Sequence, residues 1–239
     1  FWELPVVGDG WVLQNSTPED SRLVSGCTNA LLWESGCGTL YDQVVERLGE
    51  ASVSSWIRGT EGWGSPGVAI AQMRSLRAGL YLGTCFDNNT AVIIPKDPAD
   101  YTAILAFCRS DEYRDAVLEI DQSIKLSNKT LLKVPFDMER WHEAACQQWP
   151  EGPPAPSSED ADEWVFAGSP EASRQPMQVA VARLLGYQWP RQAGTDLAGC
   201  PSVETDGLDE FADADGIVCI PSVRGEQSAA DRMLAILTA

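Results

Sequence analysis

Residues that can contact nucleic acid gather in the middle of the chain. Three amides whose side chains can hydrogen-bond to base edges or phosphates lie there: Asn88, Asn89 and Asn128. Five cations that can neutralise phosphates lie in the same part: Arg58, Arg74, Lys125, Lys129 and Lys133. Taken singly, each is better explained as a turn-forming asparagine or a solvated cation. Their grouping is what favours recognition of DNA.

The charge pattern indicates where DNA would be tolerated. The chain has 239 residues and a formal net charge of -18, which argues against a protein that coats nucleic acid without specificity. Residues 56–145 hold ten Lys or Arg against twelve Asp or Glu, a difference of minus two, so the remaining seven and twenty-three differ by minus sixteen. Within this near-neutral centre, Asp87 is the sole acid of residues 62–96, and residues 122–136 contain none. A phosphate backbone is best accommodated at these two stretches.

The motifs of S-adenosylmethionine-dependent DNA methylation are missing from the sequence. The stretch ESGCG at 34–38 superficially resembles the Gly-rich end of a first Rossmann strand, but no second βα unit follows it, so a plain turn is favoured. The pair Pro153-Pro154 lacks the preceding amide and following aromatic ring that base-flipping methylation uses. We therefore expect no cofactor and no catalytic residue in this chain.

Other chemistries find little support. His142 follows Trp141 in a predicted helix without an acid and a nucleophile in a suitable pattern, so we expect a surface or helix-packing histidine. No C-x-x-C, H-x-x-x-H or EF-hand spacing predicts a metal site. The seven cysteines are odd in number and scattered, which favours reduced thiols in the cytoplasm. No apolar run approaches 18 residues, so we expect a soluble protein with no membrane partner.

The elements that would position the polar residues are short strands and helices, an α/β (α+β) arrangement of a small mixed sheet with flanking helices. Short, partly β-branched runs between breakers predict strands at 68–73, 78–83, 91–95 and 130–134. Helical spacing predicts helices at 41–48, 98–108, 111–120, 137–149, 173–186 and 227–237. Ser110, Asp137 and Ser173 are the expected N-terminal caps of three of them. Residues 87–89, Asp-Asn-Asn, supply the turn before the 91–95 strand.

Proline and acidic residues mark the expected domain boundary. Residues 150–170 contain five prolines and five acids but no base, so they cannot propagate a helix. We therefore predict a target-recognition-like α/β domain at 1–149, a Pro- and acid-rich linker at 150–172, and a loop-rich, acidic helical segment at 173–239. Because the chain begins at Phe1 rather than Met, we expect it to be a piece of a longer polypeptide.

Residues 56–141 resemble a known family. FDNNTAVIIP, AILAFC and TLLKVPFD, in this order, resemble the C-terminal target-recognition half of class I adenine-specific DNA methyltransferases, closest to the Eco57I-like enzymes that include the methylase of the DISARM anti-phage system. LLWESGCGTL, QVAVARLLGY and DGIVCIPSVRGE also resemble segments of this family, so the similarity covers most of the chain.

The resemblance implies a division of labour. The parent enzyme would transfer a methyl group from S-adenosylmethionine to N6 of adenine in double-stranded DNA through an N-terminal catalytic domain that this chain lacks. The chain itself would hold and read the duplex in restriction-modification or phage defence. A second hypothesis is an acidic protein-interaction module that assembles a defence complex with other subunits. A third, that the chain is itself an enzyme, requires S-adenosylmethionine binding.

Overall fold

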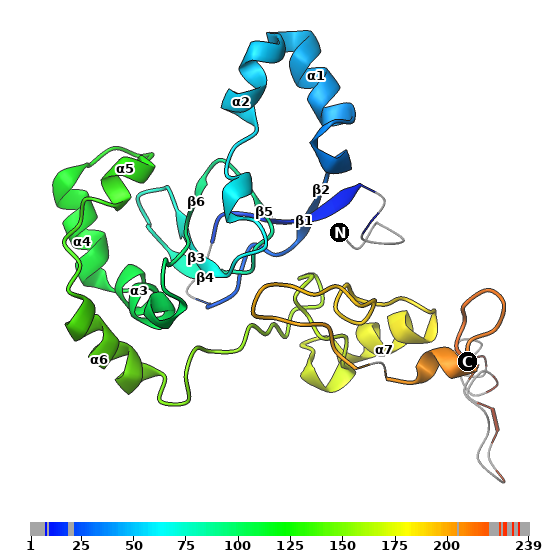
Figure 1. Cartoon of the computed structure of the whole chain (residues 1–239). Helices are drawn as coiled ribbons and strands as arrows, with labels where there is room; N and C mark the ends of the chain where they lie inside the picture. The colour runs from blue at the N-terminus through cyan, green and yellow to red at the C-terminus, as the bar shows by residue number, and fades with distance from the viewer. Residues whose placement is uncertain are drawn as a thin grey trace.

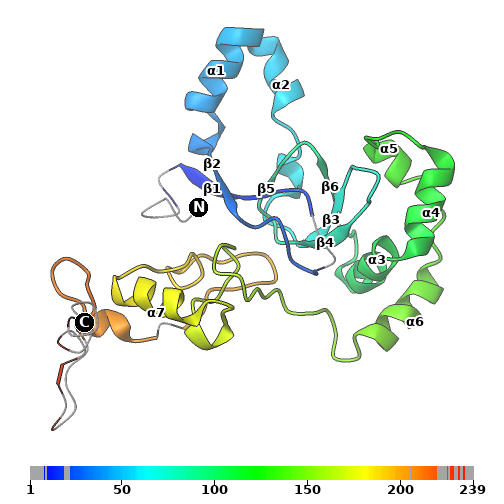
Figure 2. The same ribbon diagram turned by 180° about the vertical axis from the view of Figure 1, so that it is seen from behind.

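The protein is a mixed α/β structure with two small sheets and seven α-helices among its described residues. The computed structural model describes residues 8, 10–18, 22–204, 206–219, 225, 227, 228, 231 and 234. Figures 1 and 2 show the sheets at the centre, the pair α1–α2 rising from them as an arm, helices α3 to α6 on one side and α7 on the other. No helix in the described residues is long and apolar enough to span a membrane.

Two three-stranded sheets replace the single sheet expected from sequence. The strands are β1 (Trp11–Asn15), β2 (Asn29–Leu32), β3 (Gly67–Ala71), β4 (Ala78–Tyr81), β5 (Cys85–Phe86) and β6 (Thr90–Ile93). The first sheet has the order β2-β1-β5, with β2 antiparallel and β5 parallel to β1. The second has the order β4-β3-β6 and is antiparallel throughout. The predicted strands at 68–73, 78–83 and 91–95 are confirmed as β3, β4 and β6.

The central strand β3 lies in the core of the molecule. Every residue from Gly67 to Ala71 is buried, which is why its apolar run does not alternate with polar residues. Gly67 is required by the close approach of β6, because a Cβ at this position would lie 2.5 Å from the backbone oxygen of Ile93. Packed on both faces, β3 fixes the position of the turns that follow β3 and precede β6.

Helices α3 to α6 form a group on one side of the second sheet, which they contact mainly through α3. The α-helices of the described residues are α1 (Thr39–Leu48), α2 (Val53–Trp56), α3 (Tyr101–Cys108), α4 (Asp111–Ile120), α5 (Asn128–Leu131), α6 (Met138–Gln148) and α7 (Pro176–Leu184). Helix α3 packs on β3, β4 and α6. The ring of Phe107 in α3 lies 5.0 Å from that of Tyr113 and 5.2 Å from that of Trp141, which joins α3, α4 and α6.

Two helix starts agree with their predicted caps. The hydroxyl of Ser110 accepts a hydrogen bond from the amide of Tyr113 at the start of α4. The carboxylate of Asp137 accepts one from the amide of Arg140 at the start of α6. Each bond satisfies an amide that has no partner inside its helix, so these two predictions are confirmed.

The strand predicted at 130–134 is wrong. Residues Asn128–Leu131 form the short helix α5 instead, because the Ser127 hydroxyl accepts a hydrogen bond from the amide of Thr130 and starts a helical turn. The hydroxyl of Tyr113 donates to the carbonyl of Leu131, and both Thr130 and Leu131 are buried against the helices. Tertiary contacts thus override the strand preference of the sequence TLLKV.

The segment 150–172 contains no α-helix, as expected, yet it contributes to the core. Trp164, Val165 and Phe166 are fully buried and belong to the same apolar cluster as Leu13 of β1 and Val179 of α7. The amide of Trp164 donates to the Cys27 carbonyl at 2.7 Å. The division into domains at 149 and 173 stays a prediction, but the segment between them is packed against the first sheet.

Helix α7 begins later than expected. Ser173 does not cap it; its hydroxyl accepts a hydrogen bond from the amide of Gln175, and the helix starts at Pro176, whose fixed φ suits the first helical turn. Gly186, at φ +82°, follows its end as predicted. The helix predicted at 227–237 and the end of the run 216–221 lie largely outside the described residues.

Candidate nucleic-acid interface

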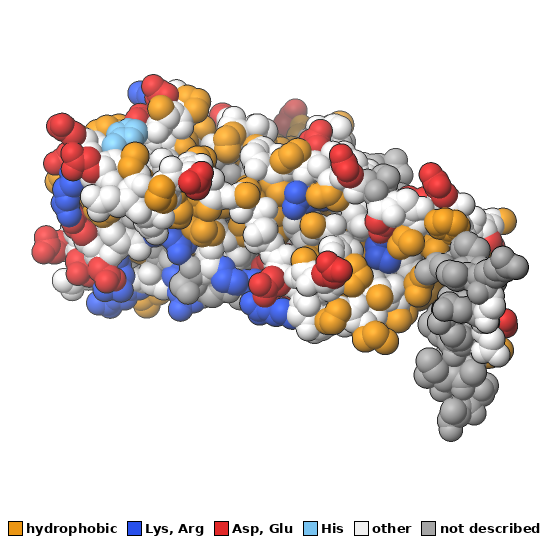
Figure 3. Space-filling view, turned by 90° about the horizontal axis from the view of Figure 1, so that it is seen from below, with side chains coloured by type: hydrophobic (Ala, Val, Ile, Leu, Met, Phe, Trp, Pro, Cys, Tyr) orange, Lys and Arg blue, Asp and Glu red, His pale blue; other side chains and the backbone are white. Residues whose placement is uncertain are grey.

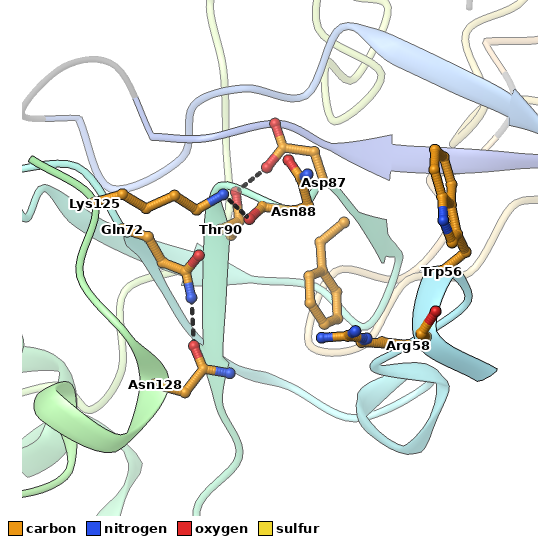
Figure 4. A pocket seen from close by; sticks show the side chains of 10 residues that line it. Trp56, Arg58, Gln72, Asp87, Asn88, Thr90, Lys125 and Asn128 are labelled. Atoms are coloured by element: carbon orange, nitrogen blue, oxygen red, sulfur yellow. Dashed lines mark hydrogen bonds between the residues drawn. The ribbon is translucent and has the colours of Figure 1, made fainter. Parts of the chain in front are cut away.

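A solvent-open pocket lies between the helical arm, the turn before β6 and α5. Its volume is about 470 Å³. Figure 4 shows Trp56 and Arg58 on one side, Lys125, Gln72 and Asn128 on the other. We call it the central pocket. Four of the eight sequence-predicted residues line it: Arg58, Asn88, Lys125 and Asn128.

The turn before β6 forms the back of the central pocket. One carboxylate oxygen of Asp87 accepts hydrogen bonds from the Asn89 amide at 3.0 Å and the Thr90 hydroxyl at 2.8 Å. The ammonium of Lys125 donates to the Asn88 carbonyl at 3.0 Å and to the Asn89 side-chain oxygen at 2.9 Å. Both contacts hold the predicted Asp-Asn-Asn turn, which is confirmed, in one conformation at the pocket wall.

Backbone hydrogen bonds position the adjoining wall, on the Lys125 side of the pocket. The carbonyl of Gln72, directly after β3, accepts from the amide of Leu126, and its amide donates to the carbonyl of Asn89. The Gln72 side-chain amide nitrogen donates to the side-chain oxygen of Asn128. This bond orients Asn128 so that its own NH₂ group points to the Arg58 side of the pocket (Figure 4). The amide pair therefore leaves a free donor at the pocket surface.

The arm supplies the outer rim. Trp56 is the last residue of α2 and keeps 65% of its surface exposed. Gly59, at φ +80°, lets the chain turn back against Phe86, since a Cβ at this position would lie 2.3 Å from the edge of the Phe86 ring. Arg58, between them, is exposed and makes no hydrogen bond or ion pair within the described part of the chain. The rim thus presents one free guanidinium and one uncovered indole.

The central pocket is cationic in an acidic protein. Its charged lining residues are Arg58 and Lys125 against Asp87, two positive charges against one negative. The Asp87 carboxylate is already engaged by Asn89 and Thr90, whereas no acid pairs with either cation in the described structure. Such a site attracts an anion, and amides beside two cations suit phosphate and base edges.

The remaining predicted residues lie around this pocket without lining it. Asn89 contacts Lys125 from the turn. Arg74 is exposed next to Met73, whose backbone bridges to Lys125, and Lys129 is exposed next to Asn128. Lys133 lies farther along the chain, near Asp121, whose pKa is held below its usual value mainly by hydrogen bonds from Ser123 and to the smallest extent by the Lys133 charge. Five of the eight predicted residues therefore lie together at the central pocket: Arg58, Asn88, Asn89, Lys125 and Asn128. Arg74 and Lys129 lie next to it in the chain, and Lys133 does not.

Sequence reasoning missed three features of the interface. Trp56 and Gln72 belong to no sequence motif, and the only local signal for Trp56 is an arginine two residues later. A smaller pocket of about 210 Å³ brings three arginines together from separate segments: Arg77, Arg109 and Arg114. Figure 3 shows Lys and Arg side chains gathered along one edge over the sheets and α3 to α6. No spacing in the sequence marks this second cationic site.

The potential catalytic groups have structural partners. His142 Nε2 lies 2.9 Å from Asp100 Oδ1, which ties α6 to the start of α3. Burial, with Asp87 nearby, raises the pKa of Cys85 to about 11, so this thiol is protonated at neutral pH. Residues 34–38 follow β2, which is antiparallel to β1, rather than the first strand of a parallel βαβ unit. No group of three or more His, Cys, Asp or Glu side chains suited to a metal ion occurs within the described residues.

Comparisons with known proteins give no further guide. No family model, curated protein or solved structure matches this chain. The functional argument therefore depends on the pocket and its chemistry.

Proposed function

We propose that this chain is the DNA target-recognition and positioning module of a bacterial adenine-N6 DNA methyltransferase of the restriction-modification or phage-defence type. It would act in the cytoplasm, without a membrane partner. The S-adenosylmethionine-binding catalytic domain would be supplied by the parent enzyme, and other defence subunits are possible partners of the assembly. The chain alone would bind double-stranded DNA and transfer no methyl group.

The observation that supports the proposal best is the central pocket. Arg58 and Lys125 come from segments 67 residues apart and meet at one concave site, where two cations outnumber the single acid Asp87 and that carboxylate accepts internal hydrogen bonds. Asn88 and Asn128 stand beside them, so cations for phosphate and amides for base edges share one surface. The formal net charge of -18 repels a polyanion from most of the protein surface, so a locally positive site favours binding at that one position.

A charge-reversal pair tests this placement. We expect the complete chain to bind a fluorescein-labelled duplex weakly at low salt, with affinity that falls as salt rises. Arg58→Glu/Lys125→Glu should weaken binding by at least tenfold and lower the slope of log K against log salt by about 2, since two phosphate contacts are lost. Fluorescence anisotropy measures both quantities, and circular dichroism checks the fold.

The matched control is Arg47→Glu/Arg174→Glu, which changes the net charge equally at exposed positions away from the central pocket. This control should retain most of the affinity for the duplex, because the pocket variant is expected to lose affinity through its missing phosphate contacts and not through the change in total charge. Equal weakening by both pairs, or unchanged binding by the pocket pair, would contradict the proposed interface.

A second candidate function is supported by the surface of α7. Met177, Val181 and Leu185, spaced four residues apart and 76%, 42% and 63% exposed, form an apolar row that we call the α7 stripe. Leu185 also lines an apolar cleft of about 330 Å³ with Tyr187 and Trp189. Figure 3 shows apolar side chains gathered in this part of the molecule.

The charge around the α7 stripe indicates its occupant. Residues 150–219 contain three Arg and no Lys against thirteen Asp or Glu, a difference of minus ten. A basic amphipathic helix, from the catalytic domain or another subunit, is complementary to an apolar row in such surroundings. This surface favours the protein-interaction role as a second activity of the same chain.

A further inference from the structure

We propose that the central pocket holds one unstacked nucleotide, with its base on the indole of Trp56 and its phosphate between Arg58 and Lys125. This rests on the proposed DNA-binding function and goes beyond it, because contact with a duplex backbone requires neither a concave pocket nor an exposed aromatic ring. The ligand class is a nucleotide outside the helical stack, supplied by a DNA strand.

The aromatic rim is the first argument. Trp56 is the last residue of a four-residue helix, with 65% of its surface exposed, at the edge of a pocket rather than on a convex surface. The ring faces of a base inside a duplex are covered by its neighbours, so an indole can stack only on a base that has left the stack. Stacking on an aromatic side chain is tolerant of sequence, because each base has a π-face.

The polar wall is the second argument. The hydrogen bond from Gln72 to Asn128 fixes both amides, and Figure 4 shows the free NH₂ of Asn128 on the side of the pocket that faces Arg58. A fixed donor at a pocket wall suits an acceptor on a base edge. Gln72 as a whole residue is only 9% exposed, so its side-chain amide acts mainly by orienting Asn128.

Size and charge complete the fit. The pocket volume of about 470 Å³ falls within the range of small-ligand sites, about 300–1,000 Å³. Arg58 and Lys125 lie on opposite sides of the space in Figure 4, with Asn88 between them. A phosphate held by both cations places its attached base against the rim formed by Trp56. The smaller arginine pocket has no aromatic residue in its lining, and its Arg114 is paired with Asp111 and Asp115, so it does not offer the same fit to a nucleotide.

The test compares a duplex that carries one extrahelical 2-aminopurine with the fully paired duplex. We expect the wild-type chain to bind the extrahelical duplex about tenfold more tightly, the effect of one base-aromatic stacking contact, and to quench its 2-aminopurine fluorescence. Trp56→Ala should abolish the preference and the quenching, so that this variant binds both duplexes with the same affinity. Trp56→Phe should retain part of the preference. Phe211→Ala, at a second exposed aromatic residue, is the matched control and should behave like wild type.

The outcomes separate the two proposals. Equal affinity of the wild-type chain for both duplexes, or an unchanged preference in Trp56→Ala, overturns the nucleotide pocket while leaving duplex binding intact. Free adenosine monophosphate forms a third arm, with Trp fluorescence as readout. Binding of the free nucleotide without binding of either duplex supports the pocket but overturns the DNA-reading function. Absence of binding in all three arms overturns both.

Discussion

Trp164 provides the sharpest test of how the chain is organised, because it lies in the segment that the sequence marks as a linker. Its side chain is fully buried, its amide donates to the Cys27 carbonyl at 2.7 Å, and its indole nitrogen donates to the Gln14 carbonyl at 3.3 Å. Trp164→Ala therefore removes an entire aromatic side chain from the core and one hydrogen bond to the first sheet.

The magnitude follows from the buried surface. An aromatic side chain buries about 150–250 Å² in a core, which at about 25 cal/mol per Å² corresponds to about 4–6 kcal/mol. Measured Trp→Ala losses in cores are about 3–5 kcal/mol, because surrounding groups relax partly into the cavity. We expect the free energy of unfolding to fall by about 4 kcal/mol.

Urea unfolding followed by far-UV circular dichroism measures this loss. Trp56→Ala is the matched control, since the same substitution at a side chain that is 65% exposed should cost about 1 kcal/mol or less. If the alanine variant does not fold, Trp164→Phe replaces it: this variant keeps an aromatic ring in the core, so it should fold and still show a lower free energy of unfolding than wild type. If the two alanine variants unfold with free energies within about 1 kcal/mol of one another, residues 150–172 do not belong to the core as argued.

Two further predictions concern the C-terminal part of the chain. Asp206→Asn should destabilise the protein by about 2 kcal/mol, because the guanidinium of buried Arg183 loses its closer carboxylate partner, at 2.7–2.8 Å, and keeps only Asp209 at 3.6 Å, while Asp206 itself is partly exposed. Hydrogen bonding to Arg183 lowers the pKa of Asp206 in the folded protein. The contribution of Asp206 to the free energy of unfolding is therefore complete above about pH 4, the pKa of an unfolded Asp, and is lost as the pH falls through the lowered pKa. The thermal midpoint should consequently fall less in the variant than in wild type when the pH is lowered from about 6 to about 3. Serine at all three positions of the α7 stripe should weaken the binding of a synthetic Leu/Lys amphipathic helix at least fivefold in anisotropy measurements. Serine at Ile124 and Leu132, two apolar side chains that are also exposed, should leave peptide binding unchanged; equal binding by both sets of variants would mean that the peptide responds only to net charge.

Local sequence signals predicted most of the regular structure. Strands β3, β4 and β6 and helices α1, α3, α4 and α6 appear where β-branched runs, helical spacing and the caps Ser110 and Asp137 indicated. Residues 130–134 failed because a Ser cap one turn earlier and the burial of Leu131 beneath α4 outweighed strand propensity. The two-residue strand β5 is too short to leave a periodic signal.

The candidate site was only partly readable from the chain. The Asp-Asn-Asn turn and the lysine-rich stretch were recognisable as polar clusters in a near-neutral region, since turn chemistry and charge are local properties. Trp56 and Gln72 became visible as site residues only when the arm and the end of β3 were placed on either side of one space. The same is true of Trp164, whose proline-rich neighbours indicated a linker.

The sequence by itself determined most of the element types, the scattered spacing of the cysteines, and the contrast between a near-neutral centre and acidic flanks, because each depends on neighbours in the chain. Tertiary structure alone decided that Lys125 holds the Asn88-Asn89 turn, that Arg58 faces it across a pocket, and that Trp164 packs beneath the first sheet. These contacts join residues separated by 36 to 137 positions, and which of the many possible long-range pairs forms is fixed by the packing of the whole core rather than by any local pattern.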